Sequence, residues 1–131
     1  MLPIYFAPLQ GFTDHVYRRA HHKICGGITQ YYTPFIRLEG GTIRKKDEHD
    51  ILPQNNEGVP VVPQIIVKSA EELLFLSHKL GELGYREIDV NMGCPFPMQT
   101  RQGRGAGLLP HPDQVAAILQ AIETLKDFSF S

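Results

Sequence analysis

The strongest constraint on the fold is a repeated alternation of short apolar runs and helical patterns. Four apolar runs of strand length occupy residues 3–7, 29–33, 61–67 and 87–91. Helical patterns follow at residues 13–23, 69–83 and 112–125, and the polar segment 38–60 has room for one short helix. Strands that alternate with helices favour a parallel sheet with helices packed outside it. The sequence therefore predicts an α/β fold made of four strand–helix units.

Local signals support this order, with one conflict. Ser69 and Glu72 have the spacing of a helix-capping box, and leucines recur on one face of the helix that follows, up to Gly84. The conflict lies in the run at 61–67, where Pro63 cannot donate a hydrogen bond to a neighbouring strand. That run is therefore a weaker candidate for a central strand than the other three.

Composition narrows the class of protein. The chain has 131 residues, with 42% hydrophobic and 21% charged, which is ordinary for one globular domain. A formal net charge of -1 gives no general attraction for nucleic acid, so any RNA contact needs a local patch. No run approaches the roughly 20 apolar residues of a membrane span, and we expect a cytoplasmic protein. Cys25 and Cys94 lack the spacing of a disulfide framework or a metal site.

Residues that follow the carboxyl ends of parallel strands build the site in both doubly wound sheets and β/α barrels. Here those segments are 8–11, 33–37, 64–68 and 91–94. The last ends at Cys94, which stands between Gly93 and Pro95 and precedes a glycine-rich stretch at 103–109. A lone cysteine is most often a small apolar packing residue, and we assign Cys25 a structural role at a helix end. The position of Cys94 indicates a functional thiol instead.

Several segments carry a family resemblance when they are taken together. They are Ala7 to Asp14 (APLQGFTD), Thr33 to Arg37 (TPFIR), Gln64, Asp89 to Pro95 (DVNMGCP) and Gly103 to Leu109 (GRGAGLL). In this order and spacing they resemble the N-terminal half of a tRNA-dihydrouridine synthase, over about residues 3 to 113. The Asn-x-Gly-Cys-Pro segment with its glycine-rich continuation is the most specific part of the match.

The resemblance implies a flavoenzyme with a (β/α)8 TIM barrel that reduces uridine to 5,6-dihydrouridine in tRNA. In that family NADPH reduces FMN, the flavin delivers hydride to C6 of uracil, and a cysteine protonates C5 from the opposite face. By motif position that acid is Cys94. Hydride addition at C6 builds enolate-like charge, which a positioned proton donor neutralises. A thiol suits this role because it is largely protonated at neutral pH.

Binding roles also follow from the resemblance. The implied FMN-binding residues are Pro8, Leu9, Gln10, Gln64 and Asn91. The implied substrate and RNA contacts are Arg37, Asn91, Arg101 and Arg104. The Gln64 amide can both donate and accept hydrogen bonds along the edge of a flavin ring.

Other positions have simpler interpretations or depart from the family pattern. The charged run at 44–50 and the adjacent His21 and His22 predict solvated helix surface, in preference to an RNA patch or a metal site. Pro34 stands where the family usually has an acidic residue, and Gln99 replaces a small aliphatic residue in the Cys94 loop. These two departures bear on substrate position and loop packing rather than on the chemistry.

Two alternatives stay open beside the resemblance. Another FMN-dependent TIM-barrel oxidoreductase would explain the Pro8 loop and Gln64, but it would not explain the Cys94 loop. A non-catalytic remnant that binds tRNA or a partner protein would retain the motif without using it.

Length adds a further expectation. A β/α barrel takes about 250 residues, and the predicted elements supply four of its eight units. We therefore expect residues 1–131 to be the N-terminal part of one FMN-binding barrel domain, without the helical tRNA-binding domain. Alone, this part is expected to be inactive and to bind FMN poorly, because the phosphate site after strands seven and eight is missing. Its open sheet edges favour self-association into a homo-oligomer.

Overall fold

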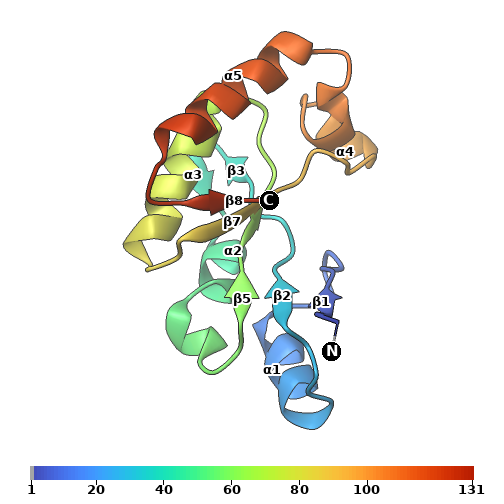
Figure 1. The fold of residues 1–131 in the computed structure, drawn as a ribbon. Coiled ribbons are helices and arrows are strands. Elements are labelled where there is room, and N and C mark those ends of the chain that lie inside the picture. The colour runs from blue at the N-terminus through green and yellow to red at the C-terminus, as the bar shows by residue number, and fades with distance from the viewer. Residues whose placement is uncertain (1) are drawn as a thin grey trace. The chain divides into compact units, whose positions relative to one another are not determined.

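The computed structural model describes residues 2–131 and divides the chain into two compact units, Met1–Gln64 and Ile65–Ser131. Each unit is described by itself below, and the colours of Figure 1 follow the chain from blue at the N-terminus to red at the C-terminus. Both units contain short parallel strands and helices, so the predicted α/β class is confirmed. Within the described residues, no helix is long and apolar enough to cross a membrane.

The N-terminal unit contains a parallel sheet with strand order β1-β2-β5. Its strands are β1 (Tyr5–Phe6), β2 (Gln30–Tyr32) and β5 (Val61–Val62). Tyr31 lies opposite Phe6 on one side and Val61 on the other, and its side chain is fully buried. Helix α1 (His15–Ile24) starts where the Asp14 carboxylate accepts a hydrogen bond from the backbone of Tyr17. The three predicted strands and the predicted helix are present, although the strands are shorter than the apolar runs suggested.

The segment between β2 and β5 is more ordered than its sequence predicted. It contains the expected short helix α2 (Lys45–Asp50), and it adds the 3-10 helix η1 (Pro53–Asn56). It also contains an antiparallel hairpin of β3 (Leu38–Glu39) and β4 (Thr42–Ile43), which the prediction missed. The two residues between these strands, Gly40 and Gly41, have φ angles of 56° and 80°. A two-residue hairpin turn with positive φ at both positions strongly favours glycine, so the glycine pair was the signal for the hairpin.

Pro63 divides the predicted strand at 61–67 into two, so that prediction is wrong in detail. β5 ends at Val62, and β6 (Gln64–Ile65) begins after the proline and belongs to a second sheet of order β6-β7-β8. Pro63 has no N–H to extend the ladder from β5. After it, the Gln64 N–H donates to the Thr33 hydroxyl at 3.0 Å instead of to a strand carbonyl.

The C-terminal unit has two long helices and a small sheet of order β6-β7-β8. The helices are α3 (Ala70–Glu82) and α5 (Pro112–Thr124), which lie side by side in Figure 1. Leu73, Leu76 and Leu80 are fully buried, as their spacing predicted. The Ser69 side chain caps α3 by accepting from the Glu72 backbone, but the Glu72 carboxylate reaches back to the N–H of Lys68 rather than that of Ser69.

Strand β7 (Glu87–Val90) is followed by the short helix α4 (Pro97–Thr100) and the 3-10 helix η2 (Gly105–Leu108). A final strand, β8 (Ser129–Phe130), pairs in parallel with β7 and was not predicted. The backbone of Ser131 continues this pairing, because its carbonyl accepts from Val90 at 2.8 Å. The described chain therefore ends in a strand that follows α5 and extends the sheet of the C-terminal unit.

Candidate active site

The loop after β7 holds Cys94 in a fixed backbone conformation. The Asn91 N–H donates to the carbonyl of Ile65 at 2.8 Å, which anchors the strand end. The Asn91 side-chain oxygen then accepts from the N–H groups of Gly93 at 3.1 Å and Cys94 at 2.9 Å. On the far side, the Cys94 carbonyl accepts from the Ala106 N–H at 2.9 Å. Both backbone groups of Cys94 are thus satisfied within the loop, and its half-exposed side chain is a free thiol.

The glycine-rich stretch packs directly against Cys94. Gly105 has a φ of +57°, and a Cβ placed on it would lie 2.6 Å from the Cys94 carbonyl oxygen and 3.0 Å from the Cys94 Cβ. A Cβ on Gly107 would lie 2.6 Å from the carbonyl oxygen of Thr100. The sequence showed that these glycines follow the cysteine. The structure gives the reason, which is close approach of two backbone segments.

Arg104 has a different environment from the one predicted for an RNA contact. It is only 3% exposed, and its Nη2 donates to the Glu72 Oε1 at 2.6 Å. A second nitrogen of the same guanidinium donates to the Gln102 side chain. We therefore correct the prediction for Arg104, because a buried guanidinium paired with a carboxylate is not available to phosphates of RNA.

The other loop positions singled out in the sequence differ in exposure. Arg101 is exposed, and its predicted RNA contact stays a prediction. Gln99, the departure from the family pattern, is 2% exposed, and its Oε1 is a buried atom without a hydrogen-bond partner. Gln99 therefore belongs to the packing of the loop, as its position suggested.

Residues predicted to bind FMN from the first strand lie in the N-terminal unit. The loop after β1 is closed by the Leu9 carbonyl, which accepts from Phe12 at 3.0 Å and from Thr13 at 3.1 Å. This closure leaves the Leu9 side chain 59% exposed beside the half-buried Pro8. An exposed apolar surface on a rigid loop fits the face of a flavin ring, so Pro8 and Leu9 suit the predicted role.

The Gln10 amide is already engaged. Its Oε1 accepts from the Phe35 N–H at 2.9 Å, and its Nε2 lies 3.5 Å from the Phe35 carbonyl oxygen. Gln10 therefore links the loops that follow β1 and β2. Gln64 is tied to the same region, because the Ile36 N–H donates to its carbonyl at 2.8 Å.

Arg37, a predicted RNA contact, forms an ion pair with Glu39 on β3. The hydrogen bond from Arg37 lowers the pKa of Glu39 below its ordinary value. The Arg37 side chain is 13% exposed. Its role in RNA binding stays a prediction.

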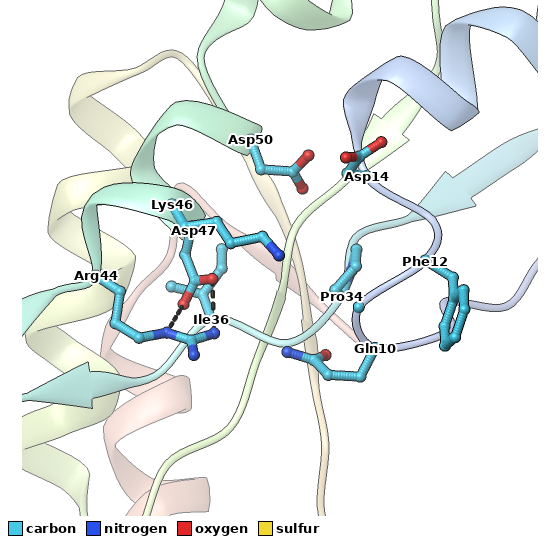
Figure 2. A pocket seen from close by; sticks show the side chains of 10 residues that line it. Gln10, Phe12, Asp14, Pro34, Ile36, Arg44, Lys46, Asp47 and Asp50 are labelled. Atoms are coloured by element: carbon cyan, nitrogen blue, oxygen red, sulfur yellow. Dashed lines mark hydrogen bonds and ion pairs between the residues drawn. The ribbon is translucent and has the colours of Figure 1, made fainter.

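A pocket of about 150 Å³ opens beside the Gln10 loop within the N-terminal unit (Figure 2). Its wall includes Phe12, Pro34 and Ile36, and the Lys46 amine extends into it. Arg44, also in the wall, is held by Asp47 through two hydrogen bonds of 2.8 Å. These bonds raise the pKa of Arg44. Three carboxylates against two cations leave this pocket without a net positive charge for an anionic ligand.

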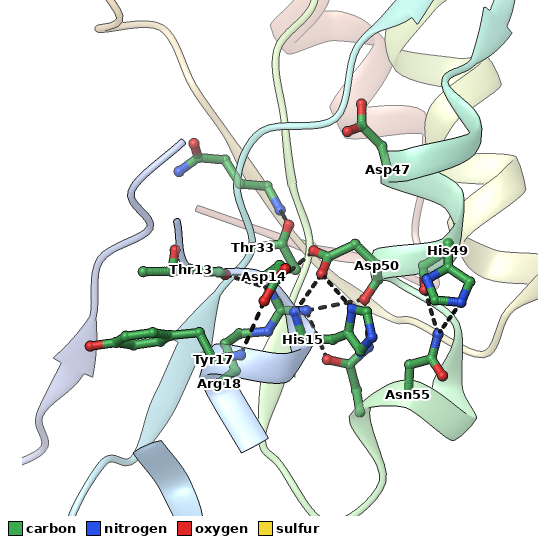
Figure 3. A network of polar contacts seen from close by, with 12 residues as sticks. Thr13, Asp14, His15, Tyr17, Arg18, Thr33, Asp47, His49, Asp50 and Asn55 are labelled. Carbon is green, nitrogen blue, oxygen red and sulfur yellow. Dashed lines mark hydrogen bonds and ion pairs between the residues drawn. The ribbon is translucent and has the colours of Figure 1, made fainter. Parts of the chain in front are cut away.

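The largest polar network of the N-terminal unit was not predicted from the sequence. Arg18 is 0% exposed, and its Nη1 donates to the Asp50 Oδ2 at 3.0 Å (Figure 3). The other Asp50 oxygen accepts from the backbone of His15 at the start of α1. Arg18 also donates to the Asn56 side chain at 2.8 Å. This network joins α1, α2 and η1.

Two surface predictions are corrected in part by these contacts. Lys45, Lys46, Glu48 and His49 are exposed, as predicted for a solvated helix face, but Asp47 and Asp50 are buried in ion pairs. His21 and His22 are half-buried rather than solvated, and the His21 ring lies 2.9 Å from the Tyr31 hydroxyl. Burial raises the pKa of Tyr31, with smaller contributions from Cys25 and Tyr17. In residues 2–131, no three His, Cys, Asp or Glu side chains gather as a metal site would require.

The structure therefore groups the predicted residues in two sets. Pro8, Leu9, Gln10 and Gln64 belong to the N-terminal unit, and Asn91 and Cys94 belong to the C-terminal unit. Within each set, hydrogen bonds connect the segments that carry these residues. The Cys94 loop in the second set is firmly fixed, because three hydrogen bonds and two close glycine contacts hold its backbone.

Comparison with known proteins decides the family. The family model described as dihydrouridine synthase (Dus) matches residues 5–128. The chain belongs to the dihydrouridine synthase family. This membership covers both units and the whole Cys94 loop, and it confirms the resemblance inferred from the sequence motifs.

Three relatives of known name show the extent of the similarity. The tRNA-dihydrouridine(16) synthase of Vibrio parahaemolyticus is 29% identical over 127 residues, which cover 90% of this chain and 38% of the relative. The probable tRNA-dihydrouridine synthase 2 of Bacillus subtilis is 30% identical, over 88% of this chain and 36% of the relative. A probable tRNA-dihydrouridine synthase of Staphylococcus aureus is also 30% identical, over 88% and 35%. The chain thus spans little more than a third of the length of these dihydrouridine synthases.

Proposed function

We propose that this chain carries the proton-donating loop of an enzyme that reduces uridine to 5,6-dihydrouridine in tRNA. Family membership supports the reaction, and the geometry around Cys94 supports the residue. Reduction of the C5–C6 double bond requires a hydride at C6 and a proton at C5. Cys94 supplies the proton, because its backbone is fixed on both sides while its thiol stays half-exposed.

FMN is the proposed cofactor and NADPH the proposed reductant. The chemistry supplied by bound FMN is delivery of hydride to uracil. On this chain, the exposed apolar surface of Pro8 and Leu9 would lie against the ring, and Gln64 would meet its edge. Gln10 would support them by holding the loop through Phe35 rather than by contacting the ring with its amide.

Asn91 has a proposed role that the structure extends. Its side-chain oxygen is used by the backbone of Gly93 and Cys94, so it shapes the loop as well as lying near the substrate base. For RNA, the proposed contacts are Arg37 and the exposed Arg101. Arg104 is no longer among them.

The proposed architecture is a (β/α)8 barrel to which residues 1–131 contribute the first strands. Parallel pairing of β1 with β2, of β2 with β5 and of β7 with β8 supports it, because consecutive strands of a barrel are neighbours. The activity, the tRNA substrate and the remaining cofactor contacts are proposed for the whole enzyme.

The decisive experiment changes Cys94→Ala at the native gene and measures dihydrouridine in tRNA nucleosides by mass spectrometry. We expect dihydrouridine to fall at one or more tRNA positions, since loss of a positioned acid slows a reaction by about 100-fold to 10,000-fold. Cys25→Ala is the matched control, because Cys25 is an exposed thiol at the end of α1. Unchanged dihydrouridine in the Cys94→Ala strain, with normal protein levels, would overturn the proposal.

A further inference from the structure

We infer that Glu72 is a positioning residue for the Cys94 thiol and acts on it through Arg104. The inference rests on the proposed function, because it assumes that the place of this thiol matters for proton transfer. The contacts that support it, however, all lie within the C-terminal unit.

The Glu72 carboxylate is held in a fixed position. Glu72 lies in the first turn of α3, where the Ser69 hydroxyl accepts from its N–H at 3.3 Å. Its Oε2 accepts from the Lys68 N–H at 3.1 Å, which ties it to the segment that follows β6. The carboxylate is therefore held by the helix and by the preceding loop before it meets any other group.

The same carboxylate binds Arg104 of the Cys94 loop. Arg104 Nη2 lies 2.6 Å from Glu72 Oε1, and Arg104 Nε lies 3.4 Å from Glu72 Oε2. The side chains are 4% and 13% exposed, so water screens the pair only weakly. Glu72 thus connects the loop after β6 with the loop after β7.

The backbone of Arg104 immediately precedes the two residues that contact Cys94. Its N–H donates to the Gln99 carbonyl at 3.1 Å, and its own carbonyl accepts from Gly107 at 3.0 Å. The next two residues are Gly105, which packs on Cys94, and Ala106, which donates to the Cys94 carbonyl. A displacement of Arg104 therefore moves the surface on which Cys94 rests.

Removal of the Glu72 charge leaves a buried guanidinium without its carboxylate. Such a group is strongly unfavourable in the interior and turns toward water. Because Arg104 and Gly105 are adjacent, this movement would open the contact between the glycine stretch and Cys94. Loss of the pair would therefore loosen the proton donor without any change at the donor itself.

The test follows the thiol directly, in the 131-residue chain with Cys25→Ala so that Cys94 is the single cysteine. Glu72→Gln keeps the size of the side chain and removes its charge. We expect the rate of Cys94 alkylation by iodoacetamide to rise by roughly fivefold or more, as expected for local opening. The Ala106 amide should lose protection from hydrogen exchange, while the Leu76 amide in the middle of α3 should not.

Two controls separate positioning from general destabilisation. Glu71→Gln removes an exposed carboxylate from the same turn, and it should leave both rates unchanged. Leu80→Ala creates a cavity under the far half of α3, which lowers stability without touching the pair. It should leave the alkylation rate of the folded protein unchanged.

If Glu72→Gln does not fold, the double variant Glu72→Leu with Arg104→Leu provides the test, because it leaves no buried charge unpaired. A folded double variant should still show faster alkylation and faster exchange at Ala106. Wild-type rates in either folded variant would overturn the inference. Failure of both variants to fold would also overturn it, because the pair would then hold the whole unit rather than the loop.

The two measurements do not depend on the proposed function. Alkylation and hydrogen exchange need neither flavin nor tRNA. If Glu72→Gln loosens the loop but Cys94→Ala leaves dihydrouridine unchanged in the cell, the proposed reaction fails and the positioning contact stands. If both hold, Glu72→Gln at the native gene should also lower dihydrouridine.

Discussion

Each unit of the molecule contains a buried arginine paired with a carboxylate, and the two pairs connect different kinds of element. In the N-terminal unit, Arg18 and Asp50 join three helical elements at their ends. In the C-terminal unit, Arg104 and Glu72 join the start of one helix to a loop. The same chemistry therefore supports a scaffold in one unit and a candidate catalytic loop in the other.

The elements that each pair connects explain the difference. Arg18 donates to two side chains and two backbone carbonyls, and Asp50 also accepts from the first residue of α1. The Arg104 guanidinium donates to Glu72 at the start of α3 and to Gln102 in its own loop. Loss of the first pair should therefore affect folding, and loss of the second should affect local order.

The largest effect is expected from Asp50→Ala in the N-terminal unit. It leaves the fully buried Arg18 without its counter-charge, and the free energy of unfolding should fall by about 3–5 kcal/mol. Chemical denaturation of wild type and variant measures the change. Lys79→Ala breaks an exposed ion pair with Glu82 and should cost less than about 1 kcal/mol. Equal losses from both variants would show that burial does not strengthen the Arg18–Asp50 pair over an exposed one.

The second effect concerns the contact behind the thiol. Gly105→Ala places a methyl group 2.6 Å from the Cys94 carbonyl oxygen, and we expect a loss of about 1–3 kcal/mol with faster Cys94 alkylation. Gly103→Ala is the matched control, since Gly103 also has a positive φ but has no atom within 4 Å of the added Cβ. It should show backbone strain alone and a wild-type alkylation rate. A control as reactive as Gly105→Ala would show that the close contact is unimportant.

A smaller effect is expected at Asn91, which orders the same loop from the front. Asn91→Ala removes the acceptor for the Gly93 and Cys94 N–H groups and should cost about 1–2 kcal/mol. Hydrogen exchange at those two amides should increase. Asn91→Asp keeps a side-chain oxygen in place and should restore much of the protection. Equal exchange in the alanine and aspartate variants would argue against this role.

The smallest effect is a pH dependence in the N-terminal unit. Burial holds the pKa of Tyr31 above the ordinary value of 10.0, so the folded state keeps its proton where the unfolded state loses it. The contribution is complete below about pH 10 and declines as pH rises toward the pKa of the folded state. Denaturation curves between pH 9 and pH 11 should show this decline, and Tyr31→Phe should show less of it. An identical slope in the variant would assign the decline to other groups.

Local signals made α3 and the Cys94 loop predictable. The capping residue Ser69, the leucine repeat and the glycine after the helix act within a few residues, so sequence alone located α3. The Cys94 motif was visible for a similar reason, since its essential residues lie in one continuous stretch. Asn91 was singled out as well, although its hydrogen bonds to the loop backbone could not be read from the sequence.

Long-range pairings were the part that the sequence could not supply. Arg18 meets Asp50, and Arg104 meets Glu72, each across 32 residues of chain. In the sequence Asp50 looks like an ordinary surface charge and Glu72 like a helix-capping residue, and nothing local marks their ion pairs with arginines. β8 escaped prediction for a related reason, because two residues become a strand only by pairing with β7. The misassigned role of Arg104 and the missed burial of Asp47 and Asp50 both come from this limit.

The glycines that pack against Cys94 have a consequence for how the sequence of this loop can vary. Positions 105 and 107 are closed to any side chain, because a single added carbon would overlap the backbone of Cys94 or Thr100. On the outer side of the same loop, Phe96, Met98 and Arg101 are exposed. Substitutions there can change what the loop meets without disturbing the thiol. In this loop the glycine positions that pack against backbone accept no side chain, whereas the exposed positions can change with the molecule that they contact.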